Sequence, residues 1–334
     1  MISTSKKIIV IGGGSWGTAL CKILSDAGNQ ISWYMRNPEA CAQFNETGIN
    51  SKYLPNTKLD TSKVKALHSF HVNAEEADIL VIAVPAAFAE KSLPLVRTEK
   101  LTNKIVISAA KGMLPENHKT LTEYLEENIG IQSLNLFFIG GPCHAEEAAE
   151  EKRSYLTLAG SNEKLGSELA KLFNTNYTSC EFHNELRVVE YAAVLKNIYA
   201  VGMGIAHGLG YGDNFQAVLA ANSWREAELF LNKTFPNSPI NLNDSSCLGD
   251  LLVTCYSMHS RNRRFGKLIG EGVSTKEIIE QINMVAEGYY AVQSFEARYG
   301  SALPYLPVVN CVFQIIKENK KAKDAFKELE SLLK

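Results

Sequence analysis

The sequence predicts an α/β protein in which a doubly wound parallel sheet is followed by an all-α domain. Three observations support this prediction. Short runs rich in isoleucine and valine alternate with helix-like stretches in the first half of the chain, and a glycine-rich turn follows the first run. In the second half, apolar residues recur at helical spacing with no convincing strand alternation.

The predicted strands are five apolar runs without polar alternation. Continuous apolar runs indicate strands buried on both faces, as in a parallel sheet with helices packed on either side. Residues that follow the carboxyl ends of such strands are the first candidates for a ligand site. The five runs are Ile8–Ile11, Ile31–Tyr34, Ile79–Val84, Ile105–Ile107 and Leu136–Ile139.

The second half of the chain predicts six helices, separated by breaks that contain Gly, Asn or Pro. The boundary near residues 183–186 contains no Ser/Gly-rich linker. We therefore expect two domains, residues 1–184 and 185–334, that pack against each other around a cleft. The six helices are expected at residues 185–206, 214–232, 262–270, 274–282, 286–298 and 308–333.

The composition narrows the classes of function. The 334 residues include 34 basic and 36 acidic side chains, for a net charge of −2. This balance argues against nucleic-acid binding and favours small-molecule substrates or protein partners. No stretch approaches the ~20 apolar residues of a membrane span, and the N-terminus resembles no signal peptide. The seven cysteines form no CxxC pair and no Cys/His cluster, so we expect no bound metal. We expect the cysteines to be free thiols in the cytoplasm.

A glycine-rich segment, residues 12–17, matches G-x-G-x-x-G between the first strand and a helical pattern. Gly12 permits a tight turn, Gly14 lets the backbone approach a pyrophosphate, and Gly17 lets the helix pack closely on the strand. The helix N-terminus attracts the phosphate charge. This context predicts a dinucleotide site, whereas the six residues alone are also compatible with a turn that binds nothing.

Arg36 stands just after the second strand, where an NAD-selective site commonly has a carboxylate for the ribose 2′-hydroxyl. A guanidinium there can bind a 2′-phosphate and stack on adenine. We therefore expect NADP to be accepted alongside NAD. The alternative is a solvated surface arginine.

Two further segments follow strands at the same edge of the predicted sheet. Lys111 comes after the strand ending at Ile107 and is expected to project into the cleft, with a surface lysine as the alternative. Residues 140–146 follow the next strand and begin a helix whose first amides can bind an anion or a nicotinamide. An ordinary helix that starts with proline has the same pattern.

Lys196 interrupts a nearly apolar helical stretch, residues 189–200. A buried ammonium needs a partner, and burial lowers its pKa towards the working pH, as a general acid requires. The alternative is that the side chain extends to solvent.

The densest polar segment is residues 247–266. Asp250 and Thr254 are four residues apart and share a helix face. Ser260, Arg261 and Asn262 then bring a hydroxyl, a guanidinium and an amide to a helix start, which suits a phosphate monoester. The alternative is a solvated basic turn with a capping serine.

Together these segments resemble the NAD(P)-dependent glycerol-3-phosphate dehydrogenases of bacterial type, over nearly the whole chain. The order and spacing of the motifs carry the resemblance more than any motif alone. The motifs are GGGSWGTAL at 12–20, the proline after Val84, AAKG at 109–112, GPCHAEE at 141–147, LKN at 195–197, HGLGYGDN at 207–214, GDLLVTC at 249–255, SRNRRFG at 260–266 and VAEG at 285–288.

The resemblance implies a Rossmann-type first domain and reversible reduction of dihydroxyacetone phosphate to sn-glycerol 3-phosphate, which supplies glycerophospholipid synthesis. It implies Lys196 as the acid/base residue, Lys111 touching both ligands, and Asp250 orienting Lys196; it also favours a homodimer. The implied substrate contacts are Gly141, Cys143, Lys111, Lys196, Asp250, Ser260, Arg261 and Asn262. The implied cofactor contacts are Gly12, Gly14, Ser15, Trp16, Gly17, Arg36, Lys111, Ala145, Arg261, Val285 and Glu287.

Two other functions remain open. A related two-domain dehydrogenase would use Ser260, Arg261 and Asn262 to bind the carboxylate of a hydroxy acid or sugar acid. A catalytically silent NAD(P)-binding sensor would use the helical domain for interaction, although a sensor has no need for Lys111, Lys196 and Asp250 together.

Overall fold

The structure is a computed structural model that describes residues 6–69, 76–92, 101–239, 241–281 and 286–334. The chain forms two compact units. The first comprises the described residues up to Val84 together with Phe88–Ala110 and Leu121–Leu186. The second comprises Pro85–Ala87, Lys111–Thr120 and Arg187–Lys334, so two short early segments belong to the C-terminal unit.

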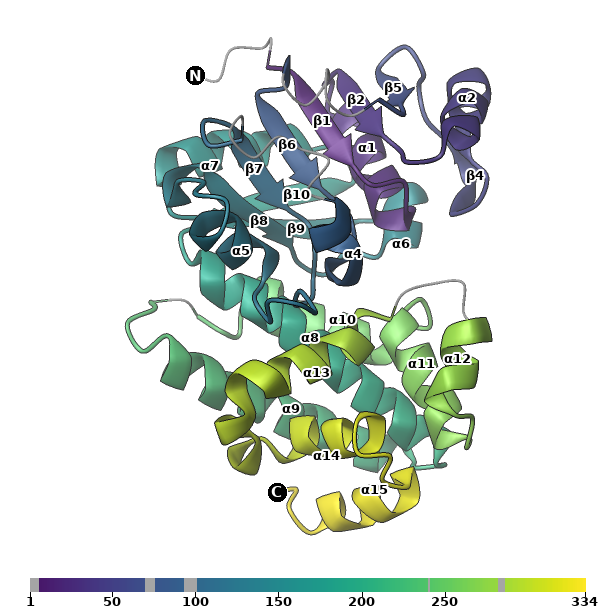
Figure 1. Ribbon diagram of the computed structural model, residues 1–334, viewed down its shortest axis with the longest axis vertical. Helices are drawn as coiled ribbons and strands as arrows, with labels where there is room; N and C mark the ends of the chain where they lie inside the picture. The colour runs from purple at the N-terminus through teal and green to yellow at the C-terminus, as the bar shows by residue number, and fades with distance from the viewer. Residues whose placement is uncertain (1–5, 70–75, 93–100, 240, 282–285) are drawn as a thin grey trace. The chain divides into compact units, whose positions relative to one another are not determined.

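The first unit is built on an eight-stranded sheet with the order β10-β9-β8-β7-β6-β1-β2-β5 (Figure 1). Six of its strands are mutually parallel, which confirms the doubly wound arrangement. These six strands are β1 (Ile8–Ile11), β2 (Ile31–Tyr34), β5 (Val64–Leu67), β6 (Ile79–Ile82), β7 (Ile105–Ser108) and β8 (Leu136–Gly140).

Beyond β5, which no predicted run covers, the sheet contains two more strands that are not predicted from the sequence. These are β9 (Ser154–Gly160) and β10 (Thr178–His183), which pair in parallel with each other, while β9 runs antiparallel to β8. An edge extension of this kind is common on otherwise parallel sheets. The short apolar stretches of these strands are separated by a helix, so local pattern alone does not reveal their direction.

Helices and one small hairpin complete the first unit. The hairpin, β3 (Ile49–Asn50) with β4 (Leu54–Lys58), is inserted between a helix and the edge strand β5. That helix, α2, starts well because Asn37 caps it and Pro38 occupies its first turn. The helices are α1 (Ser15–Asp26), α2 (Pro38–Thr47), α5 (Leu121–Glu127), α6 (Ala145–Ala149) and α7 (Glu163–Ala170), and α4 (Ala86–Ser92) begins in the second unit.

From Leu186 on, every regular element of the described residues is helical, as expected, whereas the Lys111–Thr120 segment of the second unit is a loop with one β-bridge between Met113 and Thr120. The expected helix over residues 308–333 is two helices, because Asn319 between them has a φ of 56°, in the left-handed region that interrupts a helix. The helices are α8 (Leu186–Gly208), α9 (Asp213–Thr234), α10 (Asp250–Tyr256), α11 (Arg261–Gly270), α12 (Thr275–Gln281), α13 (Glu287–Tyr299), α14 (Pro307–Ile316) and α15 (Ala322–Glu330).

The core of the second unit is organised around α8. By length and composition α8 is apolar enough to cross a membrane, but its apolar window is wholly buried inside the protein. Tyr191 and Tyr199 of α8 and Phe295 of α13 are among the largest fully buried side chains of the protein. A helix that is apolar on all sides and surrounded by other helices is a core helix.

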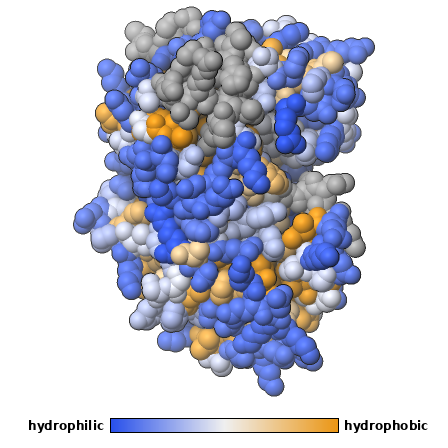
Figure 2. All heavy atoms as spheres, in the orientation of Figure 1, coloured by the Kyte–Doolittle hydropathy of each residue, from blue (hydrophilic) through white to orange (hydrophobic). Residues whose placement is uncertain are grey.

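The outermost helix of this unit shows the opposite pattern. α15 buries Ala325, Phe326 and Leu329 and presents charged residues on its other face. Figure 2 shows hydrophilic residues gathered where α15 lies in Figure 1. All seven cysteines fall within the described residues, and each is a buried free thiol.

Candidate active site

Three charged side chains meet inside the helical unit. Lys196 of α8 forms an ion pair with Oδ1 of Asp250, the first residue of α10, and both residues are buried. The ammonium of Lys111 lies 3.6 Å from the other carboxylate oxygen, Oδ2. The structure therefore brings together the three residues expected to act in catalysis, and Lys196 does not extend to solvent.

The environment of Lys196 changes its proton affinity. Burial lowers the pKa of Lys196 to about 8, Asp250 opposes this shift by its negative charge, and the positive charge of Lys111 adds to it. An ammonium with a pKa near the working pH can both donate and recover a proton. Lys196 is thus a group suited to acid/base chemistry.

The backbone of Lys111 is held by a chain of side-chain amides. Asn197 Nδ2 donates to the Lys111 carbonyl at 2.7 Å, and Asn262 Nδ2 donates to Asn197 Oδ1 at 2.7 Å. Asn262 Oδ1 in turn accepts the N–H of Gly288 at 2.9 Å. This chain joins the Lys111 segment to α8, α11 and the start of α13.

The rest of the segment 111–120 is anchored to the same helices. Met113 is fully buried in the helical core, and Thr120 Oγ1 donates to the buried carboxylate of Glu190 at 2.7 Å. The position of Lys111 is therefore determined by the helical unit rather than by the strand that precedes it.

The start of α11 carries the candidate phosphate-binding residues. Ser260 is the N-cap, its hydroxyl accepting the N–H of Arg263 at 3.3 Å, and it is buried. Arg261 is half-buried and Asn262 is buried. As the cap, the Ser260 hydroxyl oxygen accepts a hydrogen bond. Its O–H therefore remains available as a donor beside the first backbone amides of the helix.

The glycine loop between β1 and α1 has the shape that the sequence pattern predicts. Gly12 has a φ of 125°, and a Cβ on Gly17 would lie 2.0 Å from the Gly12 carbonyl oxygen. A side chain at residue 17 would collide with this carbonyl, so the helix can start this close to the loop only with glycine at that position. Ser15 is the first residue of α1, and Trp16 follows it.

The remaining candidates lie apart from these groups in the chain. Arg36 is exposed just after β2, and Gly141, with a φ of 101°, follows β8. Cys143 is buried and Ala145 begins α6. Glu287 Oε1 accepts the N–H of Ala86 at 3.1 Å. Val285 lies outside the described residues.

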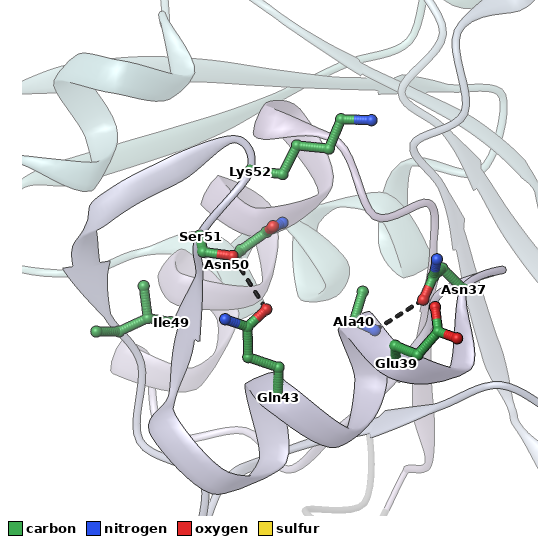
Figure 3. Close-up of a pocket in the computed structure, with 8 residues that line it drawn as sticks. All are labelled: Asn37, Glu39, Ala40, Gln43, Ile49, Asn50, Ser51 and Lys52. Atoms are coloured by element: carbon green, nitrogen blue, oxygen red, sulfur yellow. Dashed lines mark hydrogen bonds between the residues drawn. The ribbon is translucent and has the colours of Figure 1, made fainter.

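A surface groove of about 440 Å³ opens beside α2, in the first unit (Figure 3). Its lining residues are mostly polar and come from α2 and the hairpin that follows it. They are Asn37, Glu39, Ala40, Gln43, Ile49, Asn50, Ser51 and Lys52. No motif in the sequence analysis points to this groove.

Comparison with known proteins gives the family. The profile described as NAD-dependent glycerol-3-phosphate dehydrogenase N-terminus matches residues 7–166, and the corresponding C-terminus profile matches residues 185–327. The glycerol-3-phosphate dehydrogenase (NAD(P)+) of Oceanobacillus iheyensis is 32% identical over 328 residues, which are 97% of this chain and 93% of the relative. The chain belongs to the NAD-dependent glycerol-3-phosphate dehydrogenase family.

Two other glycerol-3-phosphate dehydrogenases agree with this assignment. That of Clostridium acetobutylicum is 33% identical over 322 residues, covering 96% of each chain. A crystal structure of the Coxiella burnetii glycerol-3-phosphate dehydrogenase matches with a TM-score of 0.88 at 27% identity, covering 98% of this chain and 99% of that one. The predicted fold class and resemblance are confirmed.

The glycine loop fits the dinucleotide of a glycerol-3-phosphate dehydrogenase. A Cβ placed on Gly14 would meet no atom within 4 Å, so the loop faces open space at the point where a pyrophosphate would approach. Among the described residues, no group of three or more His, Cys, Asp or Glu is placed to hold a metal ion.

Asn197 is a residue of this site that the sequence alone does not single out. It occurs in the LKN motif but was given no role, whereas its side chain connects Lys111 to Asn262. The available signal was a second polar residue beside Lys196 in an otherwise apolar helix. A buried amide in such a place needs partners for both its donor and its acceptor.

Proposed function

We propose that this protein catalyses the reversible, NAD(P)H-dependent reduction of dihydroxyacetone phosphate to sn-glycerol 3-phosphate. The observation that carries the proposal is the buried Lys196–Asp250 ion pair with Lys111 beside it, in a chain of the glycerol-3-phosphate dehydrogenase family. A protein that only binds a dinucleotide has no need for two lysines around one buried carboxylate.

The proton step belongs to Lys196. NADH or NADPH, when bound, would supply the hydride, and a group near the carbonyl oxygen of the substrate would have to neutralise the negative charge that forms there. Lys196, with a pKa of about 8, donates a proton to that oxygen in the reducing direction and takes it back in the oxidising direction. Asp250 orients the Lys196 ammonium, and Lys111 stabilises the same oxygen electrostatically.

The phosphate of the substrate is assigned to the start of α11. Arg261 supplies a guanidinium, Ser260 a hydroxyl and Asn262 an amide N–H, next to the helix N-terminus. Gly141 and Cys143 are assigned to the remainder of the substrate.

The dinucleotide is assigned mainly to the first unit, with residues 1–184 as the binding domain and 185–334 as the substrate domain. The glycine loop would bind the pyrophosphate and Arg36 the adenosine end, including the 2′-phosphate of NADP. The residues assigned to the cofactor are Gly12, Gly14, Ser15, Trp16, Gly17, Arg36, Lys111, Ala145, Arg261, Val285 and Glu287.

The cellular setting follows from the family and the composition. We place the protein in the cytoplasm as a homodimer, where it supplies sn-glycerol 3-phosphate for glycerophospholipid synthesis. Its near-neutral charge supports small-molecule partners and no nucleic acid.

The test is the loss of absorbance at 340 nm when purified protein meets dihydroxyacetone phosphate with NADH, and separately with NADPH. We expect turnover with both cofactors and none with an unphosphorylated hydroxy acid or its keto form. Turnover of the unphosphorylated acid would favour a hydroxy-acid dehydrogenase instead. Cofactor binding without turnover of any candidate ketone would favour a sensor.

A further inference from the structure

The carbonyl groups of the glycine loop are each held by a different side chain. Trp33 Nε1 donates to the Gly12 carbonyl at 2.9 Å. Asn50 Nδ2 donates to the Gly13 carbonyl at 3.0 Å, and Thr18 Oγ1 donates to the Gly14 carbonyl at 2.9 Å. Each of three consecutive peptide planes is therefore fixed by a side-chain hydrogen bond.

This arrangement determines where the amide groups of the loop point. A trans peptide holds its C=O and the following N–H on opposite sides. Because a hydrogen bond fixes each carbonyl of Gly12, Gly13 and Gly14, it also fixes the direction of the N–H group of the residue that follows. Such a row of N–H groups at a helix start is what binds a pyrophosphate.

Asn50 reaches the loop from outside the β1–α1–β2 unit that carries the motif. It lies in β3, where the pairing with β4 shifts register between Ile49 and Asn50. Such irregularities redirect side chains. Only 8% of Asn50 is exposed. In the groove shown in Figure 3, the hydrogen bond to Gln43 comes from the hydroxyl of the neighbouring Ser51 and not from Asn50.

The Asn50 amide serves two partners with its two hydrogens. The second hydrogen is donated to Thr18 Oγ1 at 2.8 Å, and the Thr18 hydroxyl then donates to the Gly14 carbonyl. The orientation of the amide is unambiguous, because the Gly13 carbonyl can only accept. Asn50 therefore holds the Gly13 carbonyl directly and the Thr18 hydroxyl that bonds the Gly14 carbonyl, a carbonyl that also accepts the Thr18 N–H at 2.9 Å.

We propose that Asn50 is a positioning residue for the cofactor: by holding the Gly13 and Gly14 carbonyls it aims the loop's N–H groups at the dinucleotide pyrophosphate. The inference rests on the proposed function to the extent that the ligand is NAD(H) or NADP(H). Asn50 itself touches neither the substrate nor the reacting atoms in this account.

The decisive variant is Asn50→Asp, which keeps the shape of the side chain and replaces its donor by an acceptor. A carboxylate oxygen facing the Gly13 carbonyl is repelled, and the loop peptides lose their fixed orientation. Losing a buried hydrogen bond of this kind weakens binding by about tenfold or more. We expect that increase in the Kd of NADH and NADPH, measured by nicotinamide fluorescence, and in the inhibition constant of ADP.

Two readouts separate positioning from general damage. The inhibition constant of adenosine, which lacks the pyrophosphate, should stay at the wild-type value, as should kcat at saturating cofactor. The matched control is Asn45→Asp, the same substitution at an amide that bonds the carbonyl and the N–H of Ala66 in β5, each at 2.9 Å, and no residue of the glycine loop. We expect this control to bind the cofactor and ADP like the wild type.

Three results would overturn the proposal: an unchanged ADP constant in Asn50→Asp, an equal loss of adenosine binding, or an equal loss in Asn45→Asp. If Asn50→Asp does not fold, Thr18→Val is compared with Thr18→Ser, which keeps the hydroxyl. Equal inhibition constants of ADP for these two variants would also overturn the proposal. Failure of the proposed function is distinguishable, because the wild-type protein would then bind NADH or NADPH without turning over dihydroxyacetone phosphate, while the ADP constants of the variants would still test the role of Asn50.

Discussion

At the scale of single residues, the chemistry depends on how one carboxylate is shared. Asp250 pairs through Oδ1 with Lys196, while Oδ2 has no hydrogen-bond partner within the described residues and lies 3.6 Å from the Lys111 ammonium. The two lysines therefore share Asp250 through different oxygens, and the positive charge of Lys111 lowers the pKa of Lys196 further.

Replacement of Lys196 tests the acid/base assignment. Lys196→Ala should lower kcat for dihydroxyacetone phosphate reduction by about 10²–10⁴-fold while cofactor binding stays intact. Lys196→Arg should lose a similar amount, because a guanidinium keeps the charge but does not release a proton near neutral pH. A decrease under tenfold in steady-state kcat for either variant would contradict the assignment.

The pH dependence follows from the lowered pKa of Lys196. Reduction requires the protonated ammonium, so kcat/KM for dihydroxyacetone phosphate should fall as the pH rises through about 8, and oxidation of sn-glycerol 3-phosphate should rise over the same range. Rates in both directions between pH 6 and pH 10 measure this, with the range chosen as roughly two units on each side of that pKa. Profiles with the same direction of change would rule out Lys196 as the titrating group.

Removal of Arg261 tests the phosphate site. Arg261→Ala should lower kcat/KM for dihydroxyacetone phosphate about 10–100-fold, because a charge-assisted hydrogen bond to phosphate contributes about 1.5–3 kcal/mol. Arg264→Ala is the control, since it removes an exposed arginine from the same helix. Unchanged KM and kcat/KM in Arg261→Ala would place the phosphate elsewhere.

At the scale of helices, α8 and α11 contact each other through their backbones. A Cβ on Gly266 of α11 would lie 2.0 Å from the Val201 carbonyl of α8, and a Cβ on Gly204 would lie 2.1 Å from the Arg263 carbonyl. Only glycine permits this approach. The close packing holds the start of α11, with Arg261 and Asn262, next to Asn197 and so beside Lys196.

Gly266→Ala should therefore disturb stability and activity together. The added methyl forces the two helices apart, which destabilises by about 1–3 kcal/mol or more and displaces the α11 start from Lys196. Gly212→Ala is the control, because a Cβ there meets no atom within 4 Å. Urea unfolding and kcat/KM measure the two effects, and a Gly266→Ala variant as stable and active as Gly212→Ala would disprove the packing argument.

At the scale of the whole chain, the second unit takes in two segments from the first half of the sequence. Residues 111–120 follow β7 of the first unit but belong to the second, where Met113 is buried and Thr120 bonds Glu190. The group of Lys111, Lys196 and Asp250 is thus assembled from both halves of the sequence, although all three residues lie in the helical unit. A cut at the expected boundary between 184 and 185 would separate Lys111 from Lys196 and Asp250.

Met113→Ala tests this dependence in the full chain. Truncation of a buried methionine should lower the free energy of unfolding by about 2–5 kcal/mol. Met258→Ala, at a residue that is 72% exposed, should change it by no more than about 0.5 kcal/mol. Urea unfolding curves compare the two variants, and equal midpoints would show that Met113 does not hold its segment to the helices.

Much of this protein could be predicted from local sequence pattern. The apolar runs determined the central strands, the glycine spacing determined the β1–α1 turn, and an interrupted apolar helix singled out Lys196. Each of these signals acts over fewer than about 20 residues, through backbone conformation or the periodic burial of side chains.

Other features were decided only by tertiary structure. The antiparallel direction of β9, the transfer of residues 111–120 to the helical unit, and the contacts of Asn197 and Asn50 all join residues far apart in the chain. Local spacing contains no information on which buried amide meets which carbonyl. Those pairings are set by how the elements pack, because a buried polar group must find its partner wherever the fold brings one within hydrogen-bond distance.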